Sequence, residues 1–258
     1  MTTTPRFTGE NPVLKFNDLD VEFRTEFGTV HAVKGLTLSV EPGEVMALVG
    51  ESGSGKSVTA TTALGLLPKT ARIQGETRVT DQSVGGLSGR QLRSLRGNRV
   101  AMVFQEPMTA LNPVIKIGEQ LTESMEVHGV AFGREAWSRA VDLLNAVGIP
   151  NAERRASQFP HELSGGMRQR VVIAMALACD PEVIIADEPT TALDVTVQAE
   201  ILDLLRSLKD KLNTGILLIT HNMGVVADMA DNVAVMFKGN IVERGPAEQV
   251  LLHPTHPY

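Results

Sequence analysis

The chemistry of this chain is concentrated in residues 50–57, where a glycine-rich turn joins an apolar run to a helical pattern. The apolar run, residues 45–49, comes directly before the turn, and the helical pattern, residues 58–67, follows it. Glycines let successive backbone N–H groups turn inward around an anion, and a helix start adds the positive end of its dipole. The spacing therefore predicts a phosphate-binding loop. Its members are Gly50, Glu51, Ser52, Gly53, Ser54, Gly55, Lys56 and Ser57.

Two side chains at the end of this loop could act on a bound nucleotide. The Lys56 ammonium can reach the β- and γ-phosphates, and the Ser57 hydroxyl can hold Mg²⁺. A glycine turn with an incidental lysine is the plainer interpretation. The apolar run before the turn and the helix after it favour the phosphate-binding interpretation instead.

Two adjacent carboxylates, Asp187 and Glu188, follow the apolar run of residues 183–186. In an open parallel sheet, ligands lie beyond the carboxyl ends of the strands. Mg²⁺ keeps several of its waters, and Asp187 could hold one of them. Glu188 could then orient and deprotonate the attacking water. A solvated acidic strand end is the alternative, and the nearby phosphate loop counts against it.

Gln105 and His221 also follow apolar runs, residues 100–104 and 216–220. The Gln105 amide could ligate Mg²⁺ or the attacking water, and His221 could donate a hydrogen bond to the γ-phosphate. A glutamine or histidine at a strand end is often only structural. Both roles therefore depend on strand ends that converge on the phosphate loop.

A second anion site is predicted where residues 163–167 open a helix over residues 168–178. Ser164 and the N–H groups of Gly165 and Gly166 could grip a phosphate there. A helix cap with flexible glycines is the plainer interpretation. Because a nucleotide bound to this chain already has the phosphate loop at residues 50–57, a second phosphate-binding site predicts contact with a nucleotide that another subunit holds.

The elements that must position these residues follow from the hydrophobic patterns. Alternation of apolar and polar residues predicts half-buried antiparallel strands, and short apolar runs predict fully buried parallel strands. Ser88 and Gln91 have capping-box spacing at a helix start. Residues 106–163 lack buried-strand runs and predict a mostly helical insertion. The predicted elements are antiparallel strands at 13–16, 19–23 and 36–40, buried strands at 45–49, 100–104, 183–186 and 216–220, helices at 88–95, 134–147 and 198–212, and a hairpin over 233–243.

Composition narrows the class of protein. The 258 residues suffice for one large α/β domain with an attached subdomain, and the net charge of −6 gives no basic surface for nucleic acid. The single cysteine, Cys179, excludes an internal disulfide and suits a small packed side chain in a reducing compartment. The longest apolar run, residues 171–178, is shorter than the roughly 20 residues that cross a bilayer. The start of the chain lacks a signal-peptide core, so we expect a cytoplasmic protein that only a partner recruits to a membrane.

With these motifs in this order, the chain resembles the nucleotide-binding subunits of ATP-binding-cassette (ABC) transporters. Phe27 stands where that family places an aromatic side chain that stacks on adenine. The resemblance covers about residues 13–258. The matching motifs are Walker A at 50–57, the Q-loop at Gln105, the signature motif at 163–167, Walker B with its catalytic glutamate at 183–188, the D-loop at 192–194 and the switch histidine at His221.

Within that family, several longer sequence segments resemble the importer branch for dipeptides, oligopeptides, nickel and related solutes. The segments that carry this likeness are residues 105–113, 159–170, 194–198 and 256–258. Members of this branch usually continue past the His-Pro-Tyr segment into a C-terminal extension. The polar, proline-rich residues 253–258 also look unlike a domain end, so we expect the natural chain to continue beyond Tyr258.

The resemblance implies an α/β fold with three parts: a P-loop NTPase core with a mainly parallel sheet, an N-terminal antiparallel β subdomain and an inserted helical subdomain. We expect one ABC ATPase domain over residues 13–258, preceded by a tail at 1–12. The core with its β subdomain would comprise residues 13–105 and 164–258. Residues 106–163 would form the helical insertion.

The resemblance also implies the ligands and partners. The cofactors would be ATP and Mg²⁺. The partners would be a second nucleotide-binding subunit, identical or related, two membrane permease subunits and, indirectly, a solute-binding protein, at the cytoplasmic face of the plasma (inner) membrane. The implied catalytic residues are Lys56, Gln105, Glu188 and His221; the nucleotide-binding residues are Phe27, residues 50–57, Ser164, Gly165, Gly166 and Asp194; and the metal-binding residues are Ser57, Gln105 and Asp187.

Other classes of protein stay open. A non-transport ABC ATPase could drive DNA repair or translation, although such proteins tend to insert coiled coils, tandem cassettes or basic linkers. A small-molecule kinase could use the same phosphate loop, but the second anion site at Ser164–Gly166 would have no role. A nucleotide-sensing regulatory module would not need Glu188.

Overall fold

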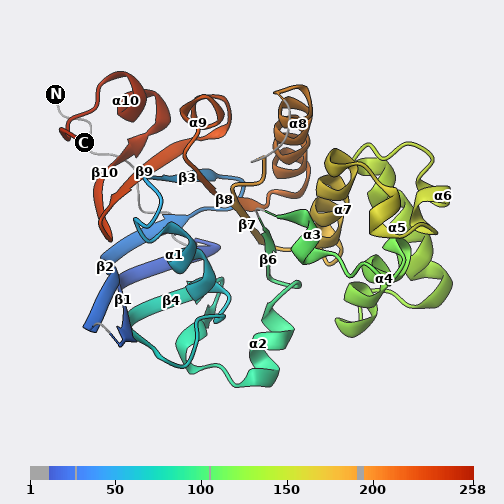
Figure 1. Ribbon diagram of the computed structural model, residues 1–258, viewed down its shortest axis with the longest axis horizontal. Helices are drawn as coiled ribbons and strands as arrows, with labels where there is room; N and C mark the ends of the chain where they lie inside the picture. The colour runs from blue at the N-terminus through green and yellow to red at the C-terminus, as the bar shows by residue number, and fades with distance from the viewer. Residues whose placement is uncertain (1–11, 27, 105, 191–194) are drawn as a thin grey trace.

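The phosphate loop and Glu188 directly follow strands of a six-stranded sheet of order β10-β9-β3-β8-β7-β6, and Asp187 is the last residue of one of these strands (Figure 1). The computed structural model describes residues 12–26, 28–104, 106–190 and 195–258. Strand β3 pairs in parallel with β8 and β9, and β7 pairs in parallel with β8 and β6. The strands are β3 (Val45–Val49), β6 (Val100–Val103), β7 (Val183–Asp187), β8 (Gly215–Thr220), β9 (Asn232–Phe237) and β10 (Asn240–Pro246).

The four predicted buried strands are thus confirmed, and their apolar runs have a physical cause. One face of the sheet joins a core with α1 and the antiparallel strands, while the other face joins a core with α5, α7 and α8. Strands covered on both sides read as continuous apolar runs. The predicted hairpin is β9 and β10, which pair antiparallel around residues 238–239.

A second, antiparallel sheet has the order β2-β1-β4-β5. The sequence separated residues 13–16 from 19–23, but they form one strand. Asp18 has a φ of 50°, and the pairing with β2 shifts between Phe16 and Leu19, so a bulge interrupts the alternation inside a continuous strand. The patterns also missed β4 entirely. The strands are β1 (Leu14–Thr25), β2 (Gly28–Val40), β4 (Ala71–Val79) and β5 (Gln82–Ser83).

The helices lie largely where their periodicity predicts them. Ser88 caps α2 in a capping box with Gln91, as the spacing indicates. Helix α1 is shorter than the predicted 58–67, because Gly65 turns the chain with a φ of 59°. The helices are α1 (Lys56–Ala63), η1 (Val84–Gly86), α2 (Gly89–Leu95), α3 (Pro107–Ala110), α4 (Ile117–Val127), α5 (Gly133–Ala146), α6 (Ala152–Ala156), η2 (Pro160–Glu162), α7 (Gly165–Leu177), α8 (Val195–Leu212), α9 (Met223–Met229) and α10 (Ala247–Leu252).

Helices α3 to α6 gather on one side of the molecule, against α7 and away from the antiparallel sheet (Figure 1). They supply the helical insertion that the absence of buried-strand runs indicates between β6 and β7. The boundaries at residues 106 and 163 stay a prediction. Among the helices of the described residues, no span is both long and apolar enough to cross a membrane.

Candidate functional site

The parallel register brings the ends of three strands to one edge of the core sheet. Val49, the last residue of β3, lies opposite Thr220 of β8, and Asp187 of β7 lies opposite Ile219. The segments that follow these strands therefore emerge side by side. These segments carry the phosphate loop, Glu188 and His221.

The loop that follows β3 is shaped by glycine. Gly55 stands at the start of α1 with a φ of 111°. A Cβ at this position would lie 2.3 Å from the carbonyl oxygen of Ala32. Only glycine suits both the conformation and this close approach. The loop thus presses against β2, and its backbone leads directly into the N-terminus of α1.

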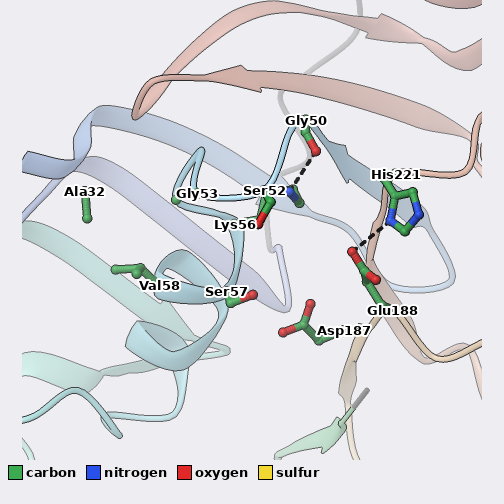
Figure 2. A pocket seen from close by; sticks show the side chains of 11 residues that line it. Ala32, Gly50, Ser52, Gly53, Lys56, Ser57, Val58, Asp187, Glu188 and His221 are labelled. Carbon is green, nitrogen blue, oxygen red and sulfur yellow. Dashed lines mark hydrogen bonds and ion pairs between the residues drawn. The ribbon is translucent and has the colours of Figure 1, made fainter. Parts of the chain in front are cut away.

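The strand ends and the loop enclose an open cleft of about 600 Å³ (Figure 2). It brings together five residues whose chemistry the sequence analysis singled out on separate segments: Lys56, Ser57, Asp187, Glu188 and His221. The volume suits a small-molecule ligand. The cleft is lined by Ala32, Gly50, Ser52, Gly53, Gly55, Lys56, Ser57, Val58, Asp187, Glu188 and His221.

Lys56 is a buried cation, with only 7% of its surface exposed. Its Nζ donates to the carbonyl oxygens of Gly50 at 2.8 Å and Glu51 at 2.9 Å (Figure 2). Burial lowers the pKa of the ammonium, while the charges of Glu188 and Asp187 act in the opposite direction. The lysine therefore spans the phosphate loop from the inside, and a bound phosphate would give its ammonium a fully charged partner.

Asp187 and Ser57 face each other across the cleft (Figure 2). Burial raises the pKa of the Asp187 carboxyl, the hydrogen bond from the Ser57 hydroxyl lowers it, and the charge of Glu188 raises it further. A carboxylate that burial disfavours gains from a nearby cation. The hydroxyl and carboxylate oxygens are ligands that Mg²⁺ prefers. A site with few protein ligands also suits this ion, because Mg²⁺ usually keeps several waters and binds phosphate oxygens. The residues present fit Mg²⁺.

Glu188 has an unusual backbone conformation and a side-chain partner within the site. Its backbone φ is 48°, in the left-handed region, and its N–H donates to the carbonyl oxygen of Ile219 at 2.8 Å. Such a conformation costs on the order of 1–3 kcal/mol for a residue with a side chain and persists where the surrounding structure fixes it. Its Oε1 lies 2.9 Å from Nδ1 of His221. The Glu188 side chain is 18% exposed and that of His221 is 64% exposed, so the imidazole is the more solvent-exposed member of the pair.

The second anion site lies apart from this cleft. Ser164 caps α7, and its side chain accepts a hydrogen bond from the N–H of Met167 at 3.3 Å. Helix α7 begins at Gly165, earlier than the predicted residue 168, so both glycines lie in its first turn. Neither they nor Ser164 line the cleft, and α7 lies beside the helical insertion (Figure 1). Their service to another subunit stays a prediction.

Three predicted site residues, Phe27, Gln105 and Asp194, lie outside the described residues. Two lining residues, Ala32 and Val58, were not predicted, because their side chains carry no chemical signature. Gln169 was not predicted either; it is a buried residue of α7 whose side-chain amide donates to the carbonyl oxygen of Pro189, the residue after Glu188. Gln169 stands between Arg168 and Arg170, ahead of the apolar run of residues 171–178, so no local signal marks it as buried.

The comparisons with known proteins agree with this site. The family model described as "ABC transporter" matches residues 33–191. The oligopeptide transport ATP-binding protein OppD of Bacillus subtilis (strain 168) is 49% identical over 248 residues, 95% of this chain and 69% of that protein. The putative peptide import ATP-binding protein BMEII0863 of Brucella melitensis biotype 1 is 50% identical over 255 residues, 96% of this chain and 75% of that protein. The chain belongs to the ABC transporter family, and as a member it is an ATP-binding ATPase.

Solved structures share the fold. The ATP-binding cassette MJ0796, in a dimeric post-hydrolysis state with ADP and Pi, has a TM-score of 0.80 at 27% identity, over 91% of this chain and 98% of that one. The protein cbiO1 of Clostridium perfringens, part of the transporter complex cbiONQ, has a TM-score of 0.75 at 30% identity, over 95% and 92% of the two chains. The predicted α/β P-loop fold with its antiparallel and helical parts is confirmed.

Proposed function

We propose that this chain is the ATP-hydrolysing subunit of a membrane importer of peptides or related solutes. Two relatives that are about half identical over nearly the whole chain are named for peptide transport and peptide import. Their names favour transport over the alternative of a non-transport ABC ATPase in DNA repair or translation. The observation that carries the catalytic part is the convergence of Lys56, Glu188 and His221 on one cleft.

The residues of the cleft divide the chemistry of ATP hydrolysis between them. The backbone N–H groups of residues 50–57 and the Lys56 ammonium would bind the β- and γ-phosphates. Glu188 would accept a proton from the attacking water as the oxygen of that water bonds to the γ-phosphorus and the bond to the β-phosphate oxygen breaks. His221, through Nδ1, would hold the Glu188 carboxylate in place. Ser57 and Asp187 would hold Mg²⁺, which when bound neutralises phosphate charge.

Roles for Phe27, Gln105 and Asp194 form part of the same proposal, by resemblance to the family. Phe27 would stack on adenine, Gln105 would reach Mg²⁺ or the attacking water, and Asp194 would lie near the nucleotide between the subunits. The domain division also belongs here, with residues 13–105 and 164–258 as the core and 106–163 as the insertion.

The second anion site would complete the cleft of a neighbouring subunit. Two subunits, identical or related, would face each other head to tail, with ATP between the phosphate loop of one and Ser164–Gly166 of the other. A nucleotide that touches both surfaces binds the closed pair better than the open pair. Reversing a 1:99 equilibrium needs about 5.5 kcal/mol of differential affinity, so each of two bridging nucleotides would supply about half. Hydrolysis would release the pair.

An apolar groove between the core and the helical insertion would receive the membrane subunit. Leu66 and Phe104 line it and are 46% and 40% exposed, a high exposure for large apolar side chains. Its other walls come from β6, α3 and α7. The groove therefore touches both the core and the helical insertion, the two parts that would move when the pair of subunits closes. A short cytoplasmic helix of a permease subunit would dock there and place this chain at the cytoplasmic face of the plasma (inner) membrane. The groove is lined by Leu64, Leu66, Arg96, Gly97, Val100, Ala101, Met102, Phe104, Ala110, Val172, Met175 and Ala176.

Reconstitution tests this function. The chain is purified together with two candidate permease subunits and placed in vesicles with a solute-binding protein and a labelled peptide library. We expect ATP-dependent peptide uptake, and loss of uptake when Phe104→Asp is introduced into the groove. Val127→Asp, a change at another exposed apolar residue, is the matched control and should leave uptake intact. Wild-type ATP hydrolysis that no membrane subunit alters, with no uptake, would contradict the transport proposal.

A further inference from the structure

Gln169 connects helix α7 to the residue that follows Glu188. Its side chain is 1% exposed, and its Nε2 donates to the carbonyl oxygen of Pro189 at 2.7 Å. A buried amide side chain needs a hydrogen-bond partner, because an unpaired polar group is costly away from water. Here the partner is the backbone next to the proposed catalytic base.

The segment Glu188–Pro189 is held from two sides, by β8 and by α7. Glu188 keeps a left-handed backbone, which persists only where the surroundings fix it. On one side its N–H is bound to Ile219 of β8. On the other side Pro189 has no N–H to donate, so its carbonyl is the group that can anchor it. Gln169 donates its hydrogen bond to that carbonyl oxygen.

Helix α7 also contacts the chain after residues 191–194. A Cβ built on Gly166 would lie 2.9 Å from Cγ1 of Val197, so the first turn of α7 approaches the start of α8 closely. Helix α7 therefore contacts the chain at Pro189 and again at Val197. Its first turn is also the second anion site, Ser164–Gly166.

We propose that Gln169 is a positioning residue that holds Glu188 through the Pro189 carbonyl, so that the carboxylate stays at His221 in the cleft. This inference rests on the proposed role of Glu188 as base. In a head-to-tail pair, α7 would then have two roles: its first turn would bind the phosphate of the neighbouring subunit's nucleotide, and Gln169 would position the catalytic base Glu188 of its own subunit.

The test compares two buried glutamines in the full chain. Gln169→Met keeps a side chain of similar length but cannot donate to Pro189. Gln120→Met is the matched control: Gln120 is 5% exposed, and its amide bonds the backbone of Asn112 and Ile115 in the helical insertion, outside the cleft. Both changes remove buried hydrogen bonds, so both should lower the midpoint of thermal unfolding.

Only Gln169→Met should alter the catalytic segment. We expect its kcat for ATP to fall roughly 10- to 100-fold, the range for a misplaced catalytic group, with KM changed less than about twofold because the phosphate loop is intact. Hydrogen exchange without nucleotide should speed up roughly tenfold or more at the Glu188 amide, which local opening would expose. In Gln120→Met, faster exchange should stay within residues 112–120, with kcat per folded protein unchanged.

Gln169→Glu supplies a pH readout that a purely structural role would not move. Burial raises the pKa of a carboxyl group, and only its protonated form can donate to the Pro189 carbonyl. The kcat of this variant relative to wild type should therefore rise as the pH is lowered. Unchanged kcat and unchanged exchange at Glu188 in Gln169→Met would overturn the inference and leave the proposed function standing. Wild-type protein without ATPase activity would refute the proposed function, and the exchange result would still decide what Gln169 holds.

Discussion

Oε1 of Glu188 and Nδ1 of His221 lie 2.9 Å apart, which joins the ends of two neighbouring strands, β7 and β8, through their side chains. The sequence suggested these residues for separate tasks, one facing water and one facing the γ-phosphate. The contact makes them one unit. With Nδ1 directed at the carboxylate, Nε2 is the imidazole nitrogen that could face a phosphate.

Glu188→Gln should abolish turnover while it preserves ATP binding. A general base contributes roughly 10²- to 10⁴-fold, and the amide keeps the size of the side chain but not its basicity. The bound nucleotide should then persist and favour the closed pair. ATPase assays and a nucleotide titration check this, with Glu182→Gln just before β7 as the control that keeps turnover. Wild-type steady-state hydrolysis by Glu188→Gln in the assembled transporter would contradict its role as base.

His221→Ala should lower kcat and should not add to the effect of Glu188→Gln. Residues that act as a unit give non-additive effects, because the second change removes nothing that the first has left working. The measurement is kcat for the two single variants and the double variant. Effects that multiply in the double variant would mean that the two side chains act independently.

Lys56→Ala should weaken nucleotide binding itself. A hydrogen bond to a charged group contributes about 1.5–3 kcal/mol, so the Kd for ATP should rise roughly 10- to 150-fold. Isothermal titration measures this directly, and Lys69→Ala at an exposed position is the control. Unchanged ATP affinity would contradict the role of Lys56.

Asp187→Asn should stabilise the free protein at neutral pH. Burial raises the pKa of Asp187 above its ordinary 3.8, so the folded state binds the proton more tightly than the unfolded state. The ionised carboxylate therefore costs stability above the folded pKa, and this cost fades as the pH falls toward 3.8. Thermal unfolding without metal or nucleotide should show a higher midpoint for Asp187→Asn at pH 7, with a difference that narrows on acidification.

The same change should weaken Mg²⁺-dependent ATP hydrolysis, because the amide lacks the charge that attracts the ion. Asp142→Asn at an exposed position is the control for both measurements. A lower unfolding midpoint for Asp187→Asn at neutral pH would contradict the direction of the pKa shift.

The sequence was sufficient where one pattern had one structural cause. Apolar runs such as residues 216–220 read correctly as buried strands, because both faces of the core sheet are covered. The phosphate loop and Asp187 could be placed at one edge because parallel strands all end there.

The sequence was insufficient where distant segments decide the outcome. The bulge at Asp18 divided β1 into two apparent strands, because a bulge shifts the alternation without ending the pairing. Strand β4 has only two buried residues, Thr77 and Val79, and carries a weak alternation, so no buried run marked it. The Gln169 contact with Pro189 joins residues 20 positions apart, and no local pattern reports such a hydrogen bond.

The most direct test of the shared site is a mixture of two variants of this chain, Lys56→Ala and Ser164→Arg, at an ATP concentration where each variant alone is inactive. Lys56→Ala has a damaged phosphate loop and an intact anion site at Ser164–Gly166. Ser164→Arg has an intact phosphate loop and a damaged anion site. In mixed pairs, one of the two sites regains both halves, so an equal mixture should recover about a quarter of wild-type ATPase activity. Mixed pairs that form, as cross-linking shows, and yet stay inactive would contradict a nucleotide site completed by a neighbouring subunit.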